Sequence, residues 1–377
     1  MEVELRYLQA GEYPVAARFL HEFWAPNHAY VRMPALFDWA FGPRPEWDHD
    51  SYSFAIARQA GEDIGILGGT PFVFNNHGRQ SHGVWLANWM VREGFRGGTT
   101  AMRLLRQFTR PPYDPTIAFG INPAVARFYA LLGGKLIADI PRHFMVLPEA
   151  SGRMLKLLGA AYPDWEDTRA RALVHCFEVM ADNPNPPAGG GIPDWPAWAR
   201  TWQTLSISMV GAARSADYLL WRYIHHPCFE YRFISALETE GVGILVWRLE
   251  KIHFTLPDGS TGEDYLGRVV EFLPASRRNG FHLLSLLTQA LREEGAMGAD
   301  FYGYHAPFGA WMSEWGFHRV TDHPDGCHLP ARFQPLVSGG GQLRSAVFSE
   351  IQAPSYPSSP GEEWYWTKSD SDQDRPN

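Results

Sequence analysis

Apolar positions near the start of the chain follow the three- and four-residue steps of an amphipathic helix, which is predicted over 15–24. The pattern then changes to that of strands. Strands are predicted over 53–57, 63–73, 84–91 and 116–121. The first two of these strands are expected to form a hairpin, so the first half of the chain combines helices with a sheet.

A glycine-rich turn, Gly94-Phe-Arg-Gly-Gly-Thr99, lies between the strand 84–91 and a helix predicted over 99–108. A turn in this position presents unpaired backbone N–H groups and the positive end of a helix dipole, which together favour a bound pyrophosphate. It lacks the Gly-Lys-Ser/Thr of a Walker loop and the GxGxxG spacing of a dinucleotide-binding loop. Both common nucleotide loops are therefore disfavoured.

A second helix is predicted directly after the strand 116–121. Asn122 and Pro123 are typical of an N-cap and a first helical residue, and Gly133-Gly134 is typical of a helix end. The order of elements here is strand, glycine turn, helix, strand, helix.

Similar short segments recur on both sides of a linker predicted over 182–196, where proline and glycine are dense. Asp38-Trp39 resembles Leu220-Trp221, 64–67 resembles 242–245, and 128–133 resembles 311–316, at offsets of 182, 178 and 183. Three matches in the same order indicate a duplicated unit. We therefore expect an α/β protein with a mixed sheet in each of two tandem domains, 1–181 and 197–377.

Composition limits the kinds of partner that the chain can have. A net charge of −8 disfavours nucleic acid, which needs clustered basic residues. Cys176, Cys228 and Cys327 are widely spaced and form no CxxC pair, so neither a disulfide framework nor a metal site is expected. The chain shows no apolar stretch of membrane-spanning length and no secretory pattern at its start. We expect a cytoplasmic protein without a membrane partner.

The segment 96–101, Arg-Gly-Gly-Thr-Thr-Ala, resembles the pyrophosphate loop of the GCN5-related N-acetyltransferases, Arg/Gln-x-x-Gly-x-Gly/Ala, although Thr99 stands where that family has its middle glycine. The segment 122–133 is similar to the family's Asn-x-x-Ala-x-x-x-Tyr-x-x-x-Gly helix, with Asn122 and Tyr129 at matching positions. Two motifs at the expected separation are more specific than either alone. The resemblance implies an acyl-CoA-dependent N-acyltransferase of mixed α/β fold.

In that family, the strand before the loop parts from its neighbour, and its free backbone N–H groups bind the thioester carbonyl. The resemblance therefore implies that coenzyme is bound by Trp89, Met90, Val91, Arg96, Gly97, Gly98, Thr99, Thr100 and Asn122. It also implies that Tyr129 protonates the departing thiolate. Candidates for a general base are His82, His28 and Glu22, and Glu22 is also expected among the acceptor contacts. Direct loss of the amine proton to water is an alternative route.

The second copy lacks these features. At the positions that match Thr99, Ala101, Asn122 and Tyr129 it carries Phe281, Leu283, His305 and Met312. Bulky side chains in the loop would keep a pyrophosphate from the backbone. We therefore expect the first domain to bind acyl-CoA and the second domain to recognise the acceptor.

The impaired second copy and the aromatic run Trp364-Tyr-Trp366 near the C-terminus resemble two-domain bacterial enzymes that acylate nucleotide-linked amino sugars for surface polysaccharides. This resemblance implies acetyl-CoA or 3-hydroxybutyryl-CoA as the co-substrate and a nucleotide-linked amino sugar, with dTDP as the expected nucleotide, as the acceptor. Acceptor contacts are expected from Arg268, Glu271, Tyr302, Tyr304 and His305. Two alternatives stay open: a transferase for another small amine, aminoacyl or thiol acceptor, and a silent acyl-CoA-binding regulator.

Overall fold

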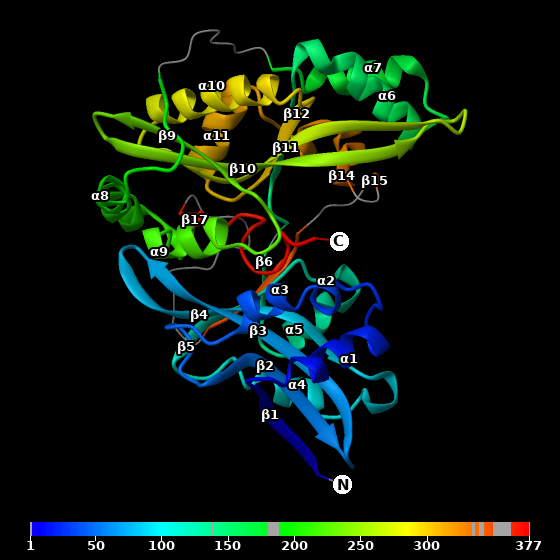
Figure 1. Ribbon diagram of the computed structural model, residues 1–377, viewed down its shortest axis with the longest axis vertical. Coiled ribbons are helices and arrows are strands. Elements are labelled where there is room, and N and C mark those ends of the chain that lie inside the picture. The colour runs from blue at the N-terminus through cyan, green and yellow to red at the C-terminus, as the bar shows by residue number, and fades with distance from the viewer. Residues whose placement is uncertain are drawn as a thin grey trace.

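The computed structural model describes residues 2–137, 139–179, 188–333, 336–338, 343–349 and 363–376. Two mixed sheets lie one above the other along the long axis of the molecule, the first half of the chain supplying most of the lower sheet in Figure 1. Among the described residues, no helix is both long enough and apolar enough to cross a membrane.

The first sheet has the order β1-β2-β3-β4-β5-β16-β6, in which only β4 and β5 are parallel neighbours. Its strands are β1 (Val3–Gln9), β2 (Ser51–Gln59), β3 (Glu62–Asn76), β4 (Arg79–Val91), β5 (Tyr113–Phe119), β6 (Lys135–Ile137) and β16 (Ser345–Phe348). Three of the predicted strands lie within these bounds, and the fourth, 116–121, ends two residues early. The short strands β8 (Val210–Ala212) and β17 (Trp364–Tyr365) extend this sheet beside β3.

Helices cover both faces of the first sheet because side chains alternate along its strands. Phe54 and Ile56 of β2 pack with α1 (Tyr13–Phe23), α2 (Ala29–Arg32) and α3 (Pro34–Phe41). Ala55 and Ala57 face the opposite way, toward α4 (Thr100–Leu105) and the cluster that includes α5 (Ala126–Leu131). The helix predicted over 15–24 is confirmed as α1, which buries Ala16, Phe19 and Leu20.

The second sheet has the order β13-β7-β12-β11-β10-β9, in which only β11 and β12 are parallel. Its strands are β7 (Arg142–Val146), β9 (Arg232–Glu238), β10 (Gly241–Thr255), β11 (Thr261–Leu273), β12 (Gly298–Tyr302) and β13 (His318–Arg319). Counted from β2 and from β9, both sheets have the same order and the same strand directions. Each also carries a bulge at the matching place, at Asn88-Trp89 in β4 and at Val270 in β11.

The two halves of the chain exchange one strand each. β7 comes from the first half and lies in the second sheet, whereas β16 comes from the second half and lies in the first. The helices α6 (Ser151–Ala161) and α7 (Asp167–Cys176), which follow β7, pack into the core of the second sheet. The expected division into 1–181 and 197–377 therefore does not coincide with the division between the sheets. A short apolar strand carries no sign of which sheet it will join.

The expected linker is ordered where the structure describes it. Residues 182–187 lie outside the described residues, Gly190 bridges to Ser235 of β9, and α8 (Trp195–Leu205) begins before the expected end of the linker. The remaining long helices of the second half are α10 (Arg277–Glu293) and α11 (Ala306–Trp315), which occupy the places of α4 and α5 in the first half.

The C-terminal tail, residues 363–376, is buried between the two sheets rather than solvated, as the red segment in Figure 1 shows. Its carboxylates form ion pairs with arginines of the second half. Asp370 lies 2.8 Å from Arg214, and Asp374 lies 2.7 Å from Arg248. Each of these four side chains is at most 5% exposed. The tail is therefore fixed to the second half of the chain by buried ion pairs.

Candidate active site at the opening of the first sheet

The strand β4 separates from β5 at the centre of the first sheet. Its pairing with β5 ends at Leu86 and Ala118, whereas its pairing with β3 continues to Val91 and Gly65. The bulge falls at the point of separation, where Asn88 has a φ of 52°. The edge of β4 beyond Leu86 is thus left open on the side that faced β5, as expected.

The open edge presents only part of the predicted set of N–H groups. The N–H of Arg92 donates to Ile64 of β3 over 2.9 Å. Because successive N–H groups of a strand point to alternate edges, the N–H of Val91 faces the opening and that of Met90 faces β3. The carbonyl of Val91 accepts from Nε of Arg96 over 3.1 Å, on the same side. Val91 is therefore the donor best placed for a ligand in the opening, and Met90 is not.

The glycine loop lies exposed beside this opening. Gly97 has a φ of 90°, which only glycine adopts without strain, and a Cβ added at Gly97 or Gly98 would meet no atom within 4 Å. Thr99 is the N-cap of α4 but makes no side-chain capping bond, and Thr100 is buried as the first helical residue. The helix ends at Leu105, three residues earlier than predicted. Space over the backbone at 97 and 98 is thus open to a ligand.

Tyr129 of α5 contacts the open edge of β4. Its ring packs edge-on against Trp89 with ring centres 5.2 Å apart, and Asn122 begins the preceding turn by accepting from the N–H of Ala124 over 2.9 Å. Burial raises the pKa of Tyr129 to about 12. The phenol is therefore protonated throughout the physiological range, as an acid or hydrogen-bond donor must be.

His28 reaches the site but is not arranged as a base. Its Nδ1 accepts from the N–H of Tyr30 over 3.2 Å, and its Nε2 lies 3.1 Å from the carboxamide of Asn88 at the bulge. Burial lowers the pKa of His28 to about 3. With its basic nitrogen occupied, His28 holds the bulge in place, and the expected role as a general base is not supported.

The other two candidates are His82 and Glu22. His82 lies seven residues before Trp89 on the same strand, roughly 20 Å from that residue at ~3.3 Å per residue, so the geometry gives no support to its expected role as a base. Glu22 is exposed on α1. The bulge residue Asn88, which contacts His28, was not predicted, since no sequence pattern marks a bulge at this position.

The corresponding opening in the second sheet is filled by the protein itself. Tyr365 of the C-terminal tail accepts from the N–H of Phe272 over 3.0 Å and donates to Glu271 over 2.6 Å. Asn279 is fully buried in the first turn of α10, where it accepts from the N–H of Ala275 and donates to the carbonyl of Ala236. In the second half, the C-terminal tail thus occupies the opening, in addition to the bulky side chains predicted for the neighbouring loop.

Two of the residues expected to hold the acceptor form ion pairs within the protein. Arg268 pairs with Asp300 over 3.0 Å, and Glu271 pairs with Arg214 over 2.9 Å. The five acceptor contacts expected in the second half are at least nine-tenths buried, namely Arg268, Glu271, Tyr302, Tyr304 and His305. This burial gives no support to their expected contact with the acceptor, which stays a prediction. Alternation along a strand predicts that a side chain is buried but not whether its partner is a ligand or the protein.

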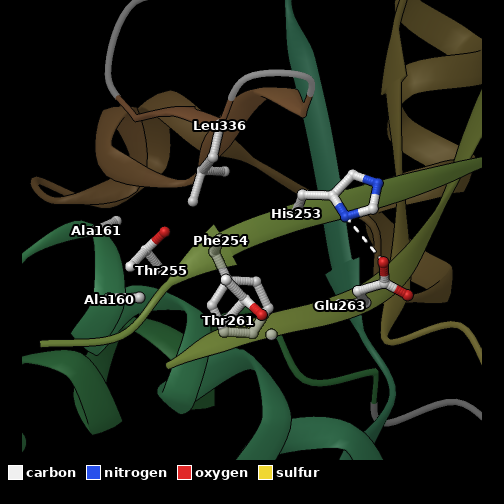
Figure 2. Close-up of a pocket in the computed structure, with 9 residues that line it drawn as sticks. Ala160, Ala161, His253, Phe254, Thr255, Thr261, Glu263 and Leu336 are labelled. Atoms are coloured by element: carbon white, nitrogen blue, oxygen red, sulfur yellow. Dashed lines mark ion pairs between the residues drawn. The ribbon is translucent and has the colours of Figure 1, made fainter. Parts of the chain in front are cut away.

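A wide cleft elsewhere in the second half is not part of this arrangement. It has a volume of about 590 Å³ and is lined by Ala160, Ala161, His253, Phe254, Thr255, Thr261, Gly262, Glu263 and Leu336. Figure 2 shows His253 turned toward Glu263, 3.0 Å away, at the far end of the β10–β11 pair. Glu263 is eight residues from Glu271 along β11, roughly 25 Å from the closed second opening. Among the described residues, no group of three or more His, Cys, Asp or Glu side chains forms a metal site.

Comparison with known proteins shows the fold of the chain. No family model matches the sequence, and no curated sequence matches it. Saccharomyces cerevisiae N-myristoyltransferase with bound myristoyl-CoA has a TM-score of 0.54 and 11% identity, over 92% of this chain and 82% of that one. GCN5-related N-acetyltransferases from Anabaena variabilis and Kribbella flavida each have a TM-score of 0.54, with 10% and 13% identity, over 92% of this chain and 72% of theirs. The chain therefore has the mixed α/β fold of the GCN5-related N-acetyltransferases.

Proposed function

We propose that the chain transfers an acyl group from acyl-CoA to an amine at the opening of the first sheet. The observation that carries this proposal is the separation of β4 from β5 beside an open glycine loop, with the N–H of Val91 facing the open edge. One structural neighbour, Saccharomyces cerevisiae N-myristoyltransferase, contains bound myristoyl-CoA, which supports a coenzyme A thioester as the co-substrate.

The residues at the opening suit the two charges that acyl transfer develops. Attack on a thioester places negative charge first on the carbonyl oxygen, and one positioned N–H donor such as that of Val91 contributes about 3 kcal/mol to the transition state. Negative charge then develops on sulfur, within reach of a donor on α5 such as Tyr129. Since the pKa of Tyr129 is about 12 and that of a thiol is about 8.5, full proton transfer to the thiolate is unfavourable by about 5 kcal/mol. We propose that Tyr129 stabilises the leaving thiolate chiefly by donating a hydrogen bond.

The acceptor amine must attack as the free base. His28 has its basic nitrogen occupied by Tyr30, and His82 lies far along the strand. We propose that the ammonium proton is lost to water before attack, so that the rate rises with pH until the amine is deprotonated.

For the acceptor, we propose a nucleotide-linked amino sugar, with dTDP as the first nucleotide to test, and an acetyl or 3-hydroxyacyl group as the donor. The support is the resemblance of the impaired second copy and the aromatic C-terminal tail to enzymes of that class. The burial of the tail beside the first sheet, where Gln373 donates to the carbonyl of Phe119 at the end of β5, is consistent with a tail that helps to shape the acceptor side.

The proposal is tested by incubating the protein with acetyl-CoA or 3-hydroxybutyryl-CoA and a panel of dTDP-, UDP- and GDP-linked amino sugars, and measuring released thiol. We expect thiol release that depends on one nucleotide sugar and one acyl-CoA together. Release with simple amines only would support acyl transfer and reject the sugar acceptor. Tight acyl-CoA binding without release from any pair would identify a binding protein instead of an enzyme.

A further inference from the structure

Arg222 is a buried cation at the junction of the two halves. It lies in the π-helical turn Leu220–Ile224, and the residue is 2% exposed. Its Nε and Nη2 are buried, and neither donates a hydrogen bond to any described residue. Arg214, equally buried, shows the usual arrangement, because it pairs with both Glu271 and Asp370. A guanidinium taken out of water normally requires such anionic partners.

The surroundings of Arg222 offer aromatic faces instead of acceptors. Its guanidinium carbon lies 4.9 Å from the ring centre of Trp39 and 5.9 Å from that of Trp221. An aromatic face attracts a cation but accepts none of the in-plane N–H groups. The carboxylate of Asp374 is already occupied, since it accepts from Arg248 over 2.7 Å and from Tyr231 over 2.6 Å.

His226 places a second buried donor against the same tryptophan. Its Nδ1 accepts from the N–H groups of Cys228 and Phe229, over 3.2 and 3.0 Å, so the proton of the neutral ring is on Nε2. This Nε2 is buried and has no partner among the described residues. The ring lies edge-on to Trp39 with centres 4.5 Å apart. Arg222 and His226, both beside Trp39, thus each have buried N–H groups that lack an acceptor among the described residues.

These donors lie close to the surface and to the opening of the first sheet. Trp39 and Trp221 are half-buried, and Cys228 and Phe229, whose N–H groups donate to His226, line a neighbouring cleft of about 150 Å³. Trp39, which Arg222 contacts, packs against the cluster that contains Tyr30, and the ring centre of Tyr30 is 5.2 Å from that of His28. His28 in turn contacts the bulge of β4. A bound group at Arg222 would therefore lie a few side chains away from the proposed acyl-transfer site.

We propose that Arg222 and His226 bind an anionic oxygen group of the acceptor, a phosphate or a carboxylate. The planar fork of a guanidinium matches two oxygens of such a group, and the imidazole N–H supplies a further donor to the same acceptor-rich ligand. The proposal rests on acyl transfer to an acceptor held at the junction, and it adds the chemistry by which that acceptor is recognised.

The test compares Arg222→Met with the matched control Arg214→Met by thermal unfolding. Arg214→Met strands two buried carboxylates and is expected to lower Tm by several degrees. Arg222→Met removes an unpaired buried charge and is expected to leave Tm unchanged or to raise it. A fall in Tm as large as that of the control would show that Arg222 is structural and would overturn the proposal.

The ligand is then tested directly with inorganic phosphate, pyrophosphate and acetate, each against sodium chloride at equal ionic strength. We expect one of these anions to raise the Tm of the wild type more than that of Arg222→Met, with Arg222→Lys between them, because only a ligand of the folded state stabilises it by mass action. Equal stabilisation of wild type and Arg222→Met would locate the anion elsewhere. Loss of the difference at saturating CoA would assign the site to the coenzyme and would also reject an acceptor role.

This readout needs no turnover, so it can succeed or fail independently of acyl transfer. Where the wild type is active, Arg222→Met is expected to raise the KM for an anionic acceptor at least about tenfold while the KM for acyl-CoA stays the same. An equal rise in both constants would contradict recognition of the acceptor by Arg222.

Discussion

At the scale of single residues, a variant of Tyr129 can distinguish a chemical role of the hydroxyl from a structural role of the ring. The ring packs against Trp89, whereas the hydroxyl forms no hydrogen bond with any described residue. We expect Tyr129→Phe to lower kcat about tenfold, since a hydrogen bond to the thiolate is lost but no full proton transfer. The free energy of unfolding should change by less than about 0.5 kcal/mol. Steady-state kinetics and urea unfolding check both values, and a large loss of stability with unchanged kcat would make Tyr129 a core residue only.

A substitution at Gly98 can test whether the glycine loop binds acyl-CoA without straining the backbone. A Cβ at this position meets no neighbouring atom, and its φ lies outside the left-handed region, unlike that of Gly97. We expect Gly98→Asp to weaken acyl-CoA binding at least about tenfold by repelling the pyrophosphate, with little effect on stability. Gly152→Asp in α6 is the matched control, because Gly152 is equally unobstructed and belongs to the second sheet. Calorimetric titration with acyl-CoA should show weaker binding in the first variant alone.

The sequence predicts a site residue when neighbouring positions along the chain determine its place in the structure. The glycine loop, Asn122 and Tyr129 follow from short motifs, because a capping residue or a helix that contacts a strand is set within a few positions along the chain. Asn88, Arg222 and His226 could not be predicted in this way. Their arrangement depends on a bulge or on contacts between residues about 180 positions apart, such as Arg222 with Trp39.

At the scale of elements, the exchange of β7 and β16 shows the limit of the hydrophobic pattern. The pattern finds strands of the first half, and the three sequence matches fall at equivalent places in the two halves, two of them on helical segments and one on the strands β3 and β10. Trp39 and Trp221, from the first match, stack with ring centres 4.8 Å apart. The exchanged strands β7 and β16 are both mostly apolar, so either sheet could bury either strand. Its destination is decided by the connections and by burial of the tail, neither of which leaves a periodic signal.

The tail residue Tyr365 is expected to matter for stability and not for coenzyme binding. Tyr365→Phe would leave the buried N–H of Phe272 without its acceptor and remove one hydrogen bond from the carboxylate of Glu271. Each loss costs about 1–3 kcal/mol, so the free energy of unfolding should fall by about 2–6 kcal/mol. Chemical denaturation measures this fall, and titration with acyl-CoA should give an unchanged Kd. A weakened Kd would mean that the second opening also takes part in coenzyme binding.

At the scale of the whole molecule, buried histidines make the fold sensitive to acid. Burial lowers the pKa of His28 and His226 to about 3 and that of His143 and His305 to about 4. In the unfolded chain these rings titrate near 6.5. Below that pH the unfolded state binds more protons than the folded state, so stability is present above about 6.5 and is lost as the pH falls toward 4. Each ring contributes a slope of up to about 1.4 kcal/mol per pH unit.

His143 isolates one such contribution away from the proposed site. It is 4% exposed, and its Nδ1 has no partner among the described residues, so His143→Leu removes a buried polar atom as well as a titrating group. Between pH 6 and pH 4.5 we expect this variant to lose about 2 kcal/mol less stability than the wild type, as urea unfolding at each pH would show. The exposed His225 supplies the control, since its replacement by leucine should leave the slope unchanged. Equal flattening in both variants would contradict this assignment, because only a ring kept neutral by burial is expected to make the folded state bind fewer protons than the unfolded one.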